Sequence, residues 1–354
     1  MTVLGAANLP TAHAEEVLHI YNWADYFAED TLENFTKETG IKVVYDTYDS
    51  DEALQAKLLI GKSGYDVVFP GTAFAADMQK VGVFQKLDPT IVANREQIDT
   101  TVMKTIMPSD VEMAYFVPYT TAVTGFAYNV DKVKERLPNA AFEGWADVFN
   151  DANGGALQDC GIGVIDAPFD FFQIALRLNG KPVDTTNREE LEAAGETIGR
   201  LRPYIRYFNS GKIIEDLANG DICFAVTWTG DGLIARARAE EIGSNVKIEV
   251  VVPKEGSVFQ ANVTGIPADA PNPKAANLFI NYLHRPDVHA DIISWVFYGT
   301  ANRGAMAALP DDLKASPGVQ LSADQVAVMW PAKNPDKDTT RVITRLWTSI
   351  KAGR

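Results

Sequence analysis

The chain has 354 residues, 46% of them hydrophobic and 22% charged, a composition that excludes a disordered protein and a length that suits two domains of ordinary size. Acidic residues outnumber basic ones by 47 to 32, and the resulting net charge of −15 argues against a basic surface for nucleic acid. Such acidity keeps a protein soluble, and it can also draw cations into an acidic cleft.

The first 14 residues are mostly small or apolar and end in Ala12-His13-Ala14, the A-x-A pattern that signal peptidase favours. We expect a signal-peptide remnant cleaved after Ala14. Because a basic region is missing, an ordinary chain terminus is the alternative. No other stretch approaches the roughly 20 apolar residues that cross a bilayer. The pattern predicts an exported protein that is soluble once processed.

The chain then alternates strands and helices in a β-α-β-α-β series. Gly40 ends the first helix, and Asp49-Ser50 can cap the second. The predicted elements are strands at 17–22, 41–48 and 65–70, and helices at 29–38, from the cap to 59, and at 74–80. Helices between strands indicate a mostly parallel sheet, which binds ligands at the carboxyl ends of its strands.

A second series of the same kind predicts a second α/β lobe. Its elements are strands at 161–165 and 223–228 and helices at 169–178 and 188–201. Two β-rich stretches, 115–129 and 246–253, suit strands that cross between the lobes. Two further helices are predicted at 274–284 and 286–295, and residues 310–335 are rich in loops.

Cys160 and Cys223 are the two cysteines, and an even count in an exported protein favours a disulfide over two buried thiols. His284 and His289 are five residues apart, which misses the i, i+4 spacing of one helical face. The chain also lacks the nucleophile, phosphate-loop and zinc motifs of common enzymes. We therefore expect no enzyme, no metal site and no cofactor.

Two clusters pair an aromatic ring with a carboxylate just after a predicted strand: Trp23, Asp25 and Tyr26 in the first, Trp228 and Asp231 in the second. An aromatic face attracts an ammonium group, and an aspartate accepts its hydrogen bonds. The arrangement suits an alkyl ammonium ligand. By spacing alone, a core tryptophan beside a helix-capping aspartate is the commoner interpretation.

Four segments carry a family resemblance: LHIYNWADY at 18–26, FTKETGIKVVY at 35–45, DLANGDIC at 216–223, and residues 341–347. They resemble the periplasmic putrescine/spermidine-binding proteins, and the likeness extends over nearly the whole mature chain. The resemblance implies a two-lobed α/β fold of the type II periplasmic binding proteins, which closes over its ligand and delivers it to the permease subunits of an ABC transporter.

The lobes implied by this fold are discontinuous and joined by crossing strands. We expect residues 15–121 plus 256–304 in the N-terminal lobe and residues 122–255 plus 305–354 in the C-terminal lobe. The implied protein is a periplasmic monomer.

Carried over position by position, the resemblance implies a ligand site of aromatic and acidic side chains. Its members are Trp23, Asp25, Tyr26, Trp228, Asp231 and Tyr298, with Asp170 and Thr72 as approximate matches to a glutamate and a small hydroxyl residue of the family. The family's paired cysteines match Cys160 and Cys223, which strengthens the disulfide prediction.

Two positions depart from the family. By register, Gln260 and Asn262 stand where the family has an aromatic residue and an amine-binding aspartate, so one ammonium site has lost its charge. We expect a binder of polyamines in which Asp25 and Asp231 hold one ammonium. The alternatives are a modified amine, such as an acylated polyamine, a guanidino compound or an amino acid, and a periplasmic ligand-sensing subunit.

Overall fold

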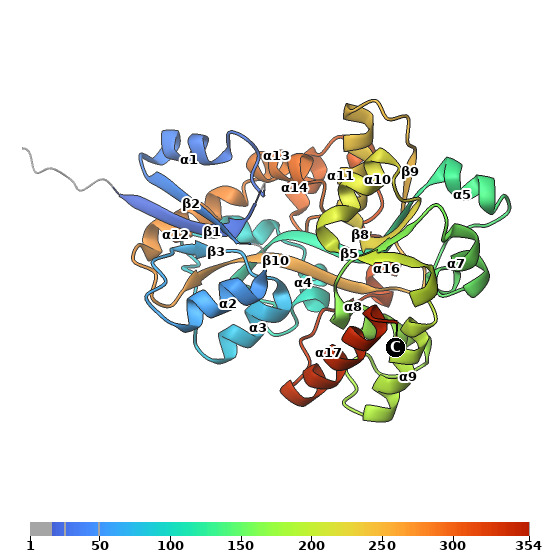
Figure 1. Ribbon diagram of the computed structural model, residues 1–354. Helices are drawn as coiled ribbons and strands as arrows, with labels where there is room; N and C mark the ends of the chain where they lie inside the picture. Colours follow the sequence, from blue (N-terminus) through green and yellow to red (C-terminus); the bar gives the residue numbers. More distant parts are fainter. Residues whose placement is uncertain (1–15, 25, 49, 354) are drawn as a thin grey trace, which may run out of the picture.

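The computed structural model describes residues 16–24, 26–48 and 50–353 (Figure 1). The predicted signal-peptide remnant, residues 1–14, lies outside the described residues. Among the described helices, none combines the length and the apolar character that crossing a bilayer requires.

The described strands pair into one network of 11. They are β1 (Val17–Trp23), β2 (Lys42–Tyr48), β3 (Val67–Val68), β4 (Phe84–Gln85), β5 (Phe116–Asn129), β6 (Ile162–Val164), β7 (Ile205–Phe208), β8 (Phe224–Trp228), β9 (Ile248–Val251), β10 (Val258–Pro267) and β11 (Trp330–Pro331). The main path runs β2-β1-β3-β10-β5-β8-β6-β7, while β4 and β11 pair with β10, and β9 pairs with β5.

Helices cover the strands on both sides. They are α1 (Thr31–Thr39), α2 (Asp51–Leu59), α3 (Thr72–Lys80), α4 (Thr100–Ile106), α5 (Val130–Arg136), α6 (Trp145–Val148), α7 (Asp151–Leu157), α8 (Pro168–Leu178), α9 (Arg188–Gly199), α10 (Ile213–Asn219), α11 (Thr229–Glu241), α12 (Pro273–Leu283), α13 (Pro286–Val296), α14 (Arg303–Ala308), α15 (Asp311–Lys314), α16 (Ala323–Val328) and α17 (Lys337–Lys351). The mixed α/β fold class is as predicted.

Local sequence signals set the ends of the first helices. Gly40 has φ 76°, and its N–H bonds the Thr36 carbonyl, so it ends α1 in the left-handed conformation that glycine adopts without penalty. Ser50 begins α2, because its hydroxyl accepts a hydrogen bond from the Ala53 N–H at 3.3 Å. The predicted β-α-β-α-β series is confirmed, although the strand expected at 65–70 shortens to β3.

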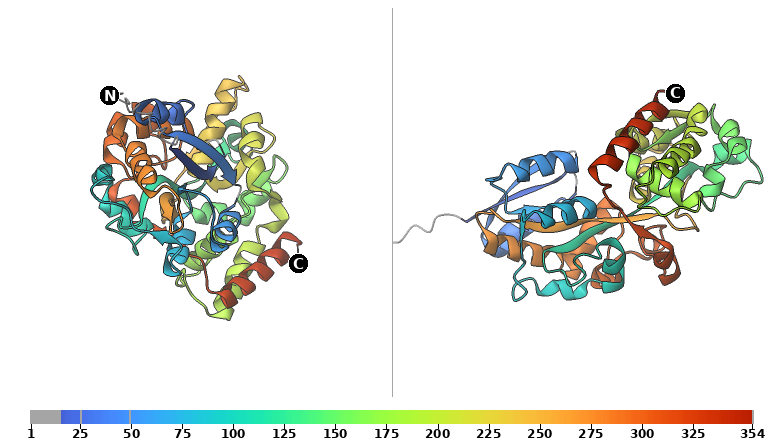
Figure 2. Two further views of the ribbon diagram at one scale, coloured as in Figure 1. Left: turned by 90° about the vertical axis from the view of Figure 1, so that its left-hand side faces the viewer. Right: turned by 90° about the horizontal axis from the view of Figure 1, so that it is seen from below.

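Two parallel sets of strands meet at a long antiparallel pair. β1 is parallel to β2 and β3, and β6 is parallel to β7 and β8. Between the two sets, β10 pairs antiparallel with β5 from Phe259↔Val123 to Gly265↔Phe116. Figure 1 and the right-hand view of Figure 2 show two groups of helices and strands with β5 and β10 running between them. The exact residue boundaries of the two lobes stay a prediction.

The second crossing strand is not the one that the sequence indicates. Within the predicted stretch 246–253, β9 pairs only with the Phe126–Asn129 end of β5. The strand that accompanies β5 through the middle is β10, for which the sequence analysis predicts no element. Most of β10 is buried, yet its residues alternate apolar and polar from Phe259 to Thr264, so this strand carries a local signal that could have identified it.

The histidines near the α12–α13 junction belong to the core. His284 and His289 are both fully buried, and the two ring nitrogens of His289 contact the Leu283 carbonyl at 3.0 Å and the Thr300 hydroxyl at 2.9 Å. Burial lowers the pKa of both rings, to about 4 for His289. Both therefore stay neutral at ordinary pH.

Candidate functional site

Two predicted acidic residues stand in the first turns of helices that follow parallel strands. Asp170 lies in α8, after β6, and Asp231 lies in α11, after β8. The free N–H groups at a helix N-terminus stabilise a carboxylate there. Because β6 and β8 are parallel neighbours, both acids lie at the same edge of the sheet.

Asp231 is buried without a positive partner. Its side chain is 7% exposed, and its two oxygens accept hydrogen bonds from the Tyr298 hydroxyl at 2.6 Å and the Thr227 hydroxyl at 3.4 Å. Among the described residues it forms no ion pair. Burial raises its pKa to about 6, although both hydroxyls oppose the shift. A ligand that brings a cation would supply the missing counter-charge.

Aromatic side chains extend the site from Asp231 toward β10. The rings of Tyr298 and Tyr26 lie 5.9 Å apart, and the Tyr26 hydroxyl accepts a hydrogen bond from Asn262 Nδ2 at 3.2 Å. Burial, and then the nearby charge of Asp231, raise the pKa of both tyrosine hydroxyls. Asp231, Tyr298, Tyr26 and Asn262 thus form one connected group of predicted site residues.

Asp170 and Trp228 form a second group. Asp170 Oδ2 accepts hydrogen bonds from the Thr124 hydroxyl at 2.6 Å and from Trp228 Nε1 at 3.4 Å, and burial raises the pKa of this carboxyl. Trp228 is the last residue of β8 and pairs with Thr124 on β5. Since Trp228 immediately precedes the first turn of α11, it connects the Asp170 group to the Asp231 group.

Trp23 ends β1 and packs at the carboxyl edge of the first parallel set. Its ring lies 4.7 Å from that of Tyr48, and its indole N–H donates to the Phe69 carbonyl at 3.1 Å. None of these contacts is with another predicted site residue. Asp25, predicted two residues further on, lies outside the described residues.

Thr72 is the first residue of α3 and is only 2% exposed, and its hydroxyl oxygen has no hydrogen-bond partner among the described residues. The residue before it, Gly71, forms a β-bridge with Asn262. Thr72 therefore lies beside the β10 part of the site, with a hydroxyl available.

Gln260 and Asn262 share a face of β10, because they are two residues apart and both partly exposed. Gln260 opens onto a cavity of about 90 Å³, which we call the α2–α8 chamber. It is lined by Asp51, Gly71, Ala73, Phe74, Phe169, Asp170, Gln173, Gln260, Ala332, Lys333 and Asn334.

Sequence reasoning missed four polar residues of this chamber, Asp51, Gln173, Lys333 and Asn334. Asp51 is the first residue of α2, where an acid beside the Ser50 cap is an ordinary helix signal. It nevertheless follows the carboxyl end of β2, so the rule that identified Trp23 and Trp228 could have found it. Gln173 lies one turn into an apolar helix, and no sequence signal marks it.

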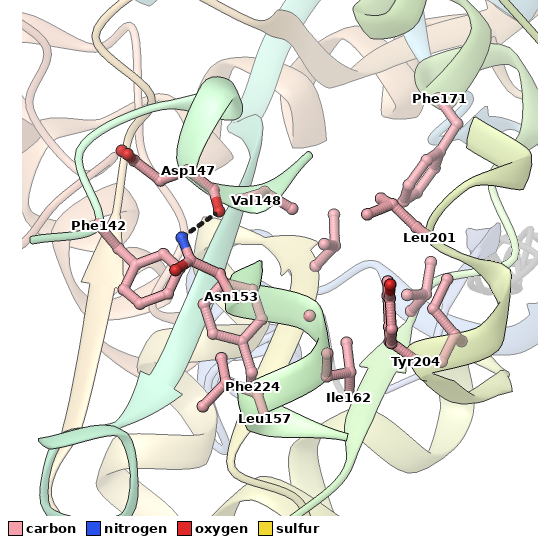
Figure 3. Close-up of a pocket in the computed structure, with 14 residues that line it drawn as sticks. Phe142, Asp147, Val148, Asn153, Leu157, Ile162, Phe171, Leu201, Tyr204 and Phe224 are labelled. Carbon is pink, nitrogen blue, oxygen red and sulfur yellow. Dashed lines mark hydrogen bonds between the residues drawn. The ribbon is translucent and has the colours of Figure 1, made fainter. Parts of the chain in front are cut away.

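Another cavity, of about 20 Å³, lies inside the second half of the molecule and is lined mainly by apolar side chains such as Phe142, Leu157 and Phe224 (Figure 3). The polar contact drawn there, from Asn153 Nδ2 to the Asp147 carbonyl at 2.8 Å, is satisfied within the protein. This cavity is a small packing void in the core and contains none of the predicted site residues. Within the described part of the chain, no three His, Cys, Asp or Glu side chains are grouped so as to hold a metal ion.

The predicted disulfide is present. Cys160 and Cys223 are bonded, with their Cα atoms 5.4 Å apart. Cys160 precedes β6 and Cys223 precedes β8, so the bridge joins the amino-terminal edge of these parallel strands, opposite the edge that carries Asp170 and Asp231.

Comparisons with known proteins place this site in context. A sequence model of the family described as bacterial extracellular solute-binding protein matches residues 30–321. The putrescine-binding periplasmic protein SpuD of Pseudomonas aeruginosa is 41% identical over all of this chain and 97% of its own length. The putrescine-binding periplasmic protein PotF of Escherichia coli is also 41% identical, over 99% of this chain and 96% of its own.

Among solved structures, the spermidine/putrescine ABC transporter substrate-binding protein PotD of Streptococcus pneumoniae superposes with a TM-score of 0.81. The match covers 96% of this chain and 99% of that one at 23% sequence identity. At this identity the likeness supports the type II fold and says nothing of the ligand.

Proposed function

The chain belongs to the bacterial extracellular solute-binding proteins, and on this premise we propose that it captures polyamines of the putrescine/spermidine kind in the periplasm for import by an ABC transporter. Its full-length relatives named above are putrescine-binding periplasmic proteins, and they are binding proteins rather than enzymes. The protein accordingly binds its ligand without altering it.

The observation that carries the proposal is the carboxylate of Asp231. It is buried and hydrogen-bonded by two hydroxyls, and it has no cation among the described residues. An isolated charge in such a position is costly, and an ammonium group would remove that cost while donating hydrogen bonds. The paired carboxyl and aromatic groups favour an alkyl ammonium over an anionic or neutral solute.

In the proposed complex, Asp231 and Asp25 hold one ammonium, and Trp23, Tyr26, Trp228 and Tyr298 cover the methylenes. Asp170, Thr72, Gln260 and Asn262 complete the site. The two lobes close over the ligand about β5 and β10, which shifts an equilibrium between open and closed forms. The closed monomer then presents itself to the permease subunits of the transporter.

A binding screen tests this function. Thermal unfolding is followed with putrescine, spermidine, n-butylamine, an acylated polyamine and an amino acid, because a ligand at about 100 times its Kd stabilises the folded protein by roughly 2.7 kcal/mol. We expect the polyamines to stabilise most. Size-exclusion chromatography with light scattering checks the expected monomer.

Asp231→Asn is the matched variant, because it keeps the size of the side chain and removes its charge. We expect polyamine affinity to fall by at least tenfold, or about 1.4 kcal/mol, in calorimetry. A protein that responds only to the amino acid or the acylated amine would contradict the proposal, as would an Asp231→Asn variant with unchanged affinity.

A further inference from the structure

The α2–α8 chamber contains two carboxylates, each of which accepts hydrogen bonds from the described residues through only one of its two oxygens. The Gly71 N–H donates to Asp51 Oδ1 at 2.9 Å, and Thr124 and Trp228 both donate to Asp170 Oδ2. From the described residues, the remaining oxygens, Asp51 Oδ2 and Asp170 Oδ1, accept no hydrogen bond. Each acid therefore keeps one free acceptor oxygen.

A third acceptor in the chamber is also free. Gln173 is 5% exposed, and its side-chain oxygen has no hydrogen-bond partner among the described residues. A buried polar atom without a partner costs about 1–3 kcal/mol, and native proteins rarely leave one unmatched. Gln173 lines this chamber together with Asp51 and Asp170, and it also lines a second cavity of about 210 Å³. A donor bound in the chamber would supply the missing hydrogen bond.

Among the described residues, no positive charge is paired with the two carboxylates of the chamber. Asp51 and Asp170 form no ion pair within the described part of the chain. Lys333 lines the cavity, but its Nζ lies 2.8 Å from Asp184 Oδ2. Burial raises the pKa of Asp51 to about 7, with a smaller contribution from Glu52, and burial likewise raises that of Asp170. Raised pKa values of this kind are typical of carboxyls that are buried without a cation, and a bound cation would lower them again.

We propose that Asp51, Asp170 and Gln173 form a second cation subsite, which takes one ammonium of a diamine while Asp231 takes the other. The inference rests on the proposed function and assigns the side chains that contact the second ammonium of the ligand. A primary ammonium has three N–H donors, equal in number to the three free acceptors. The subsite supplies the charge that Asn262 does not.

The positions of the two subsites along β10 agree with a short alkyl chain between them. Gln260 opens onto the chamber, whereas Asn262 bonds Tyr26 in the Asp231 group. Two residues of strand separate these positions by about 7 Å. A ligand with two cationic ends and an aliphatic middle matches this layout better than a single cation with a polar tail.

Calorimetry with 1,4-diaminobutane and n-butylamine tests the subsite, because the two probes share a four-carbon chain and differ in the second ammonium. Asp51→Asn keeps the size of the side chain and an oxygen for the Gly71 N–H. We expect it to weaken diaminobutane binding at least tenfold, which is about 1.4 kcal/mol, and to change butylamine binding less than about threefold. Gln173→Leu should weaken diaminobutane selectively in the same way.

Glu189→Gln is the charge-matched control, since Glu189 is exposed on α9 and should affect neither probe. If the wild type binds neither amine, polyamine capture itself is wrong. If the wild type binds diaminobutane and both Asp51→Asn and Gln173→Leu bind it equally well, the subsite is wrong and the proposed function stands. Equal loss of both probes in Asp51→Asn would also overturn the subsite.

Discussion

Asp51, Asp170 and Asp231 share one local design, in which an acid in the first turn of a helix points into the molecule. The helix N-terminus favours the charged carboxylate, but burial is the largest influence on the pKa of all three and raises it. Burial therefore outweighs the hydrogen bonds that these carboxylates accept. A bound cation would favour the charged form of all three acids.

We expect cation binding to weaken as the pH falls. In the free protein the pKa of Asp231 is about 6 and that of Asp51 about 7, and a bound ammonium favours the charged form of each. Below these values the ligand must displace a proton, so affinity falls by up to tenfold per pH unit for each proton released. The amine, with a pKa near 10, stays charged throughout, as the tyrosines stay neutral.

Calorimetry of diaminobutane binding between about pH 5 and pH 8, in buffers of different ionisation enthalpy, measures both the affinity and the protons released. In the Asp51→Asn variant, the change of affinity near pH 7 should disappear, and the change near pH 6, which belongs to Asp231, should remain. An affinity that is constant over this range, or that rises on acidification, would show that neither carboxyl meets the cation.

At the scale of elements, the start of α11 sets the position of Tyr298. Gly230 leaves room for the Tyr298 ring, because a Cβ on Gly230 would lie 2.5 Å from two of its ring carbons. Phe297, at φ 56°, ends α13 in the left-handed conformation just before Tyr298. The hydrogen bond from Tyr298 to Asp231 thus depends on a close approach between two helix ends.

Gly230→Ala should weaken polyamine binding without unfolding the protein. Alanine favours a helix over glycine by about 1 kcal/mol, but overpacking of this kind costs about 1–3 kcal/mol and should displace the Tyr298 ring. We expect affinity to fall about tenfold, because the hydroxyl that orients Asp231 moves away. Calorimetry and thermal unfolding measure the two effects.

Gly199→Ala in α9 is the control, since its added Cβ would meet no atom within 4 Å. It should preserve affinity. If Gly230→Ala binds as tightly as the wild type, the contact between α11 and Tyr298 does not position the carboxylate.

At the scale of the whole molecule, the disulfide and the proposed binding site lie at opposite edges of the second parallel set. The disulfide lies at the amino-terminal edge of β6 and β8, and the acids lie at the carboxyl edge. The bridge closes a long loop, with a sequence separation of 63 residues, which in the loop-closure account restricts the unfolded chain.

Replacing both cysteines by alanine should lower the free energy of unfolding by about 4 kcal/mol and leave polyamine affinity within about twofold. Denaturant unfolding of the variant, and of the wild type with and without reductant, gives the comparison. The reduced wild type should match the variant. An unchanged unfolding midpoint, or a large loss of affinity in the folded variant, would contradict this separation.

The sequence by itself determined the elements whose signals are local. Gly40 and Ser50 mark helix ends through their own backbone and side-chain chemistry, Pro286 starts α13, and the alternation of strands and helices was sufficient for the α/β class. Trp228 and Asp231 could be identified as an aromatic-acid pair because the end of a predicted strand, where they lie, is recognisable in the sequence. Their role in ligand binding stays a prediction.

Only the tertiary structure decided which distant residues meet. The residues of β10 alternate as those of a strand do, but nothing in that pattern selects β5 as the partner of β10 or brings Asn262 to Tyr26. In the sequence, Asp51 is an ordinary acid at the start of a helix. Only the packing of the chain buries it in a cavity shared with α8, and this burial raises its pKa. Burial and long-range contact arise from how the chain packs, so no window of sequence contains them.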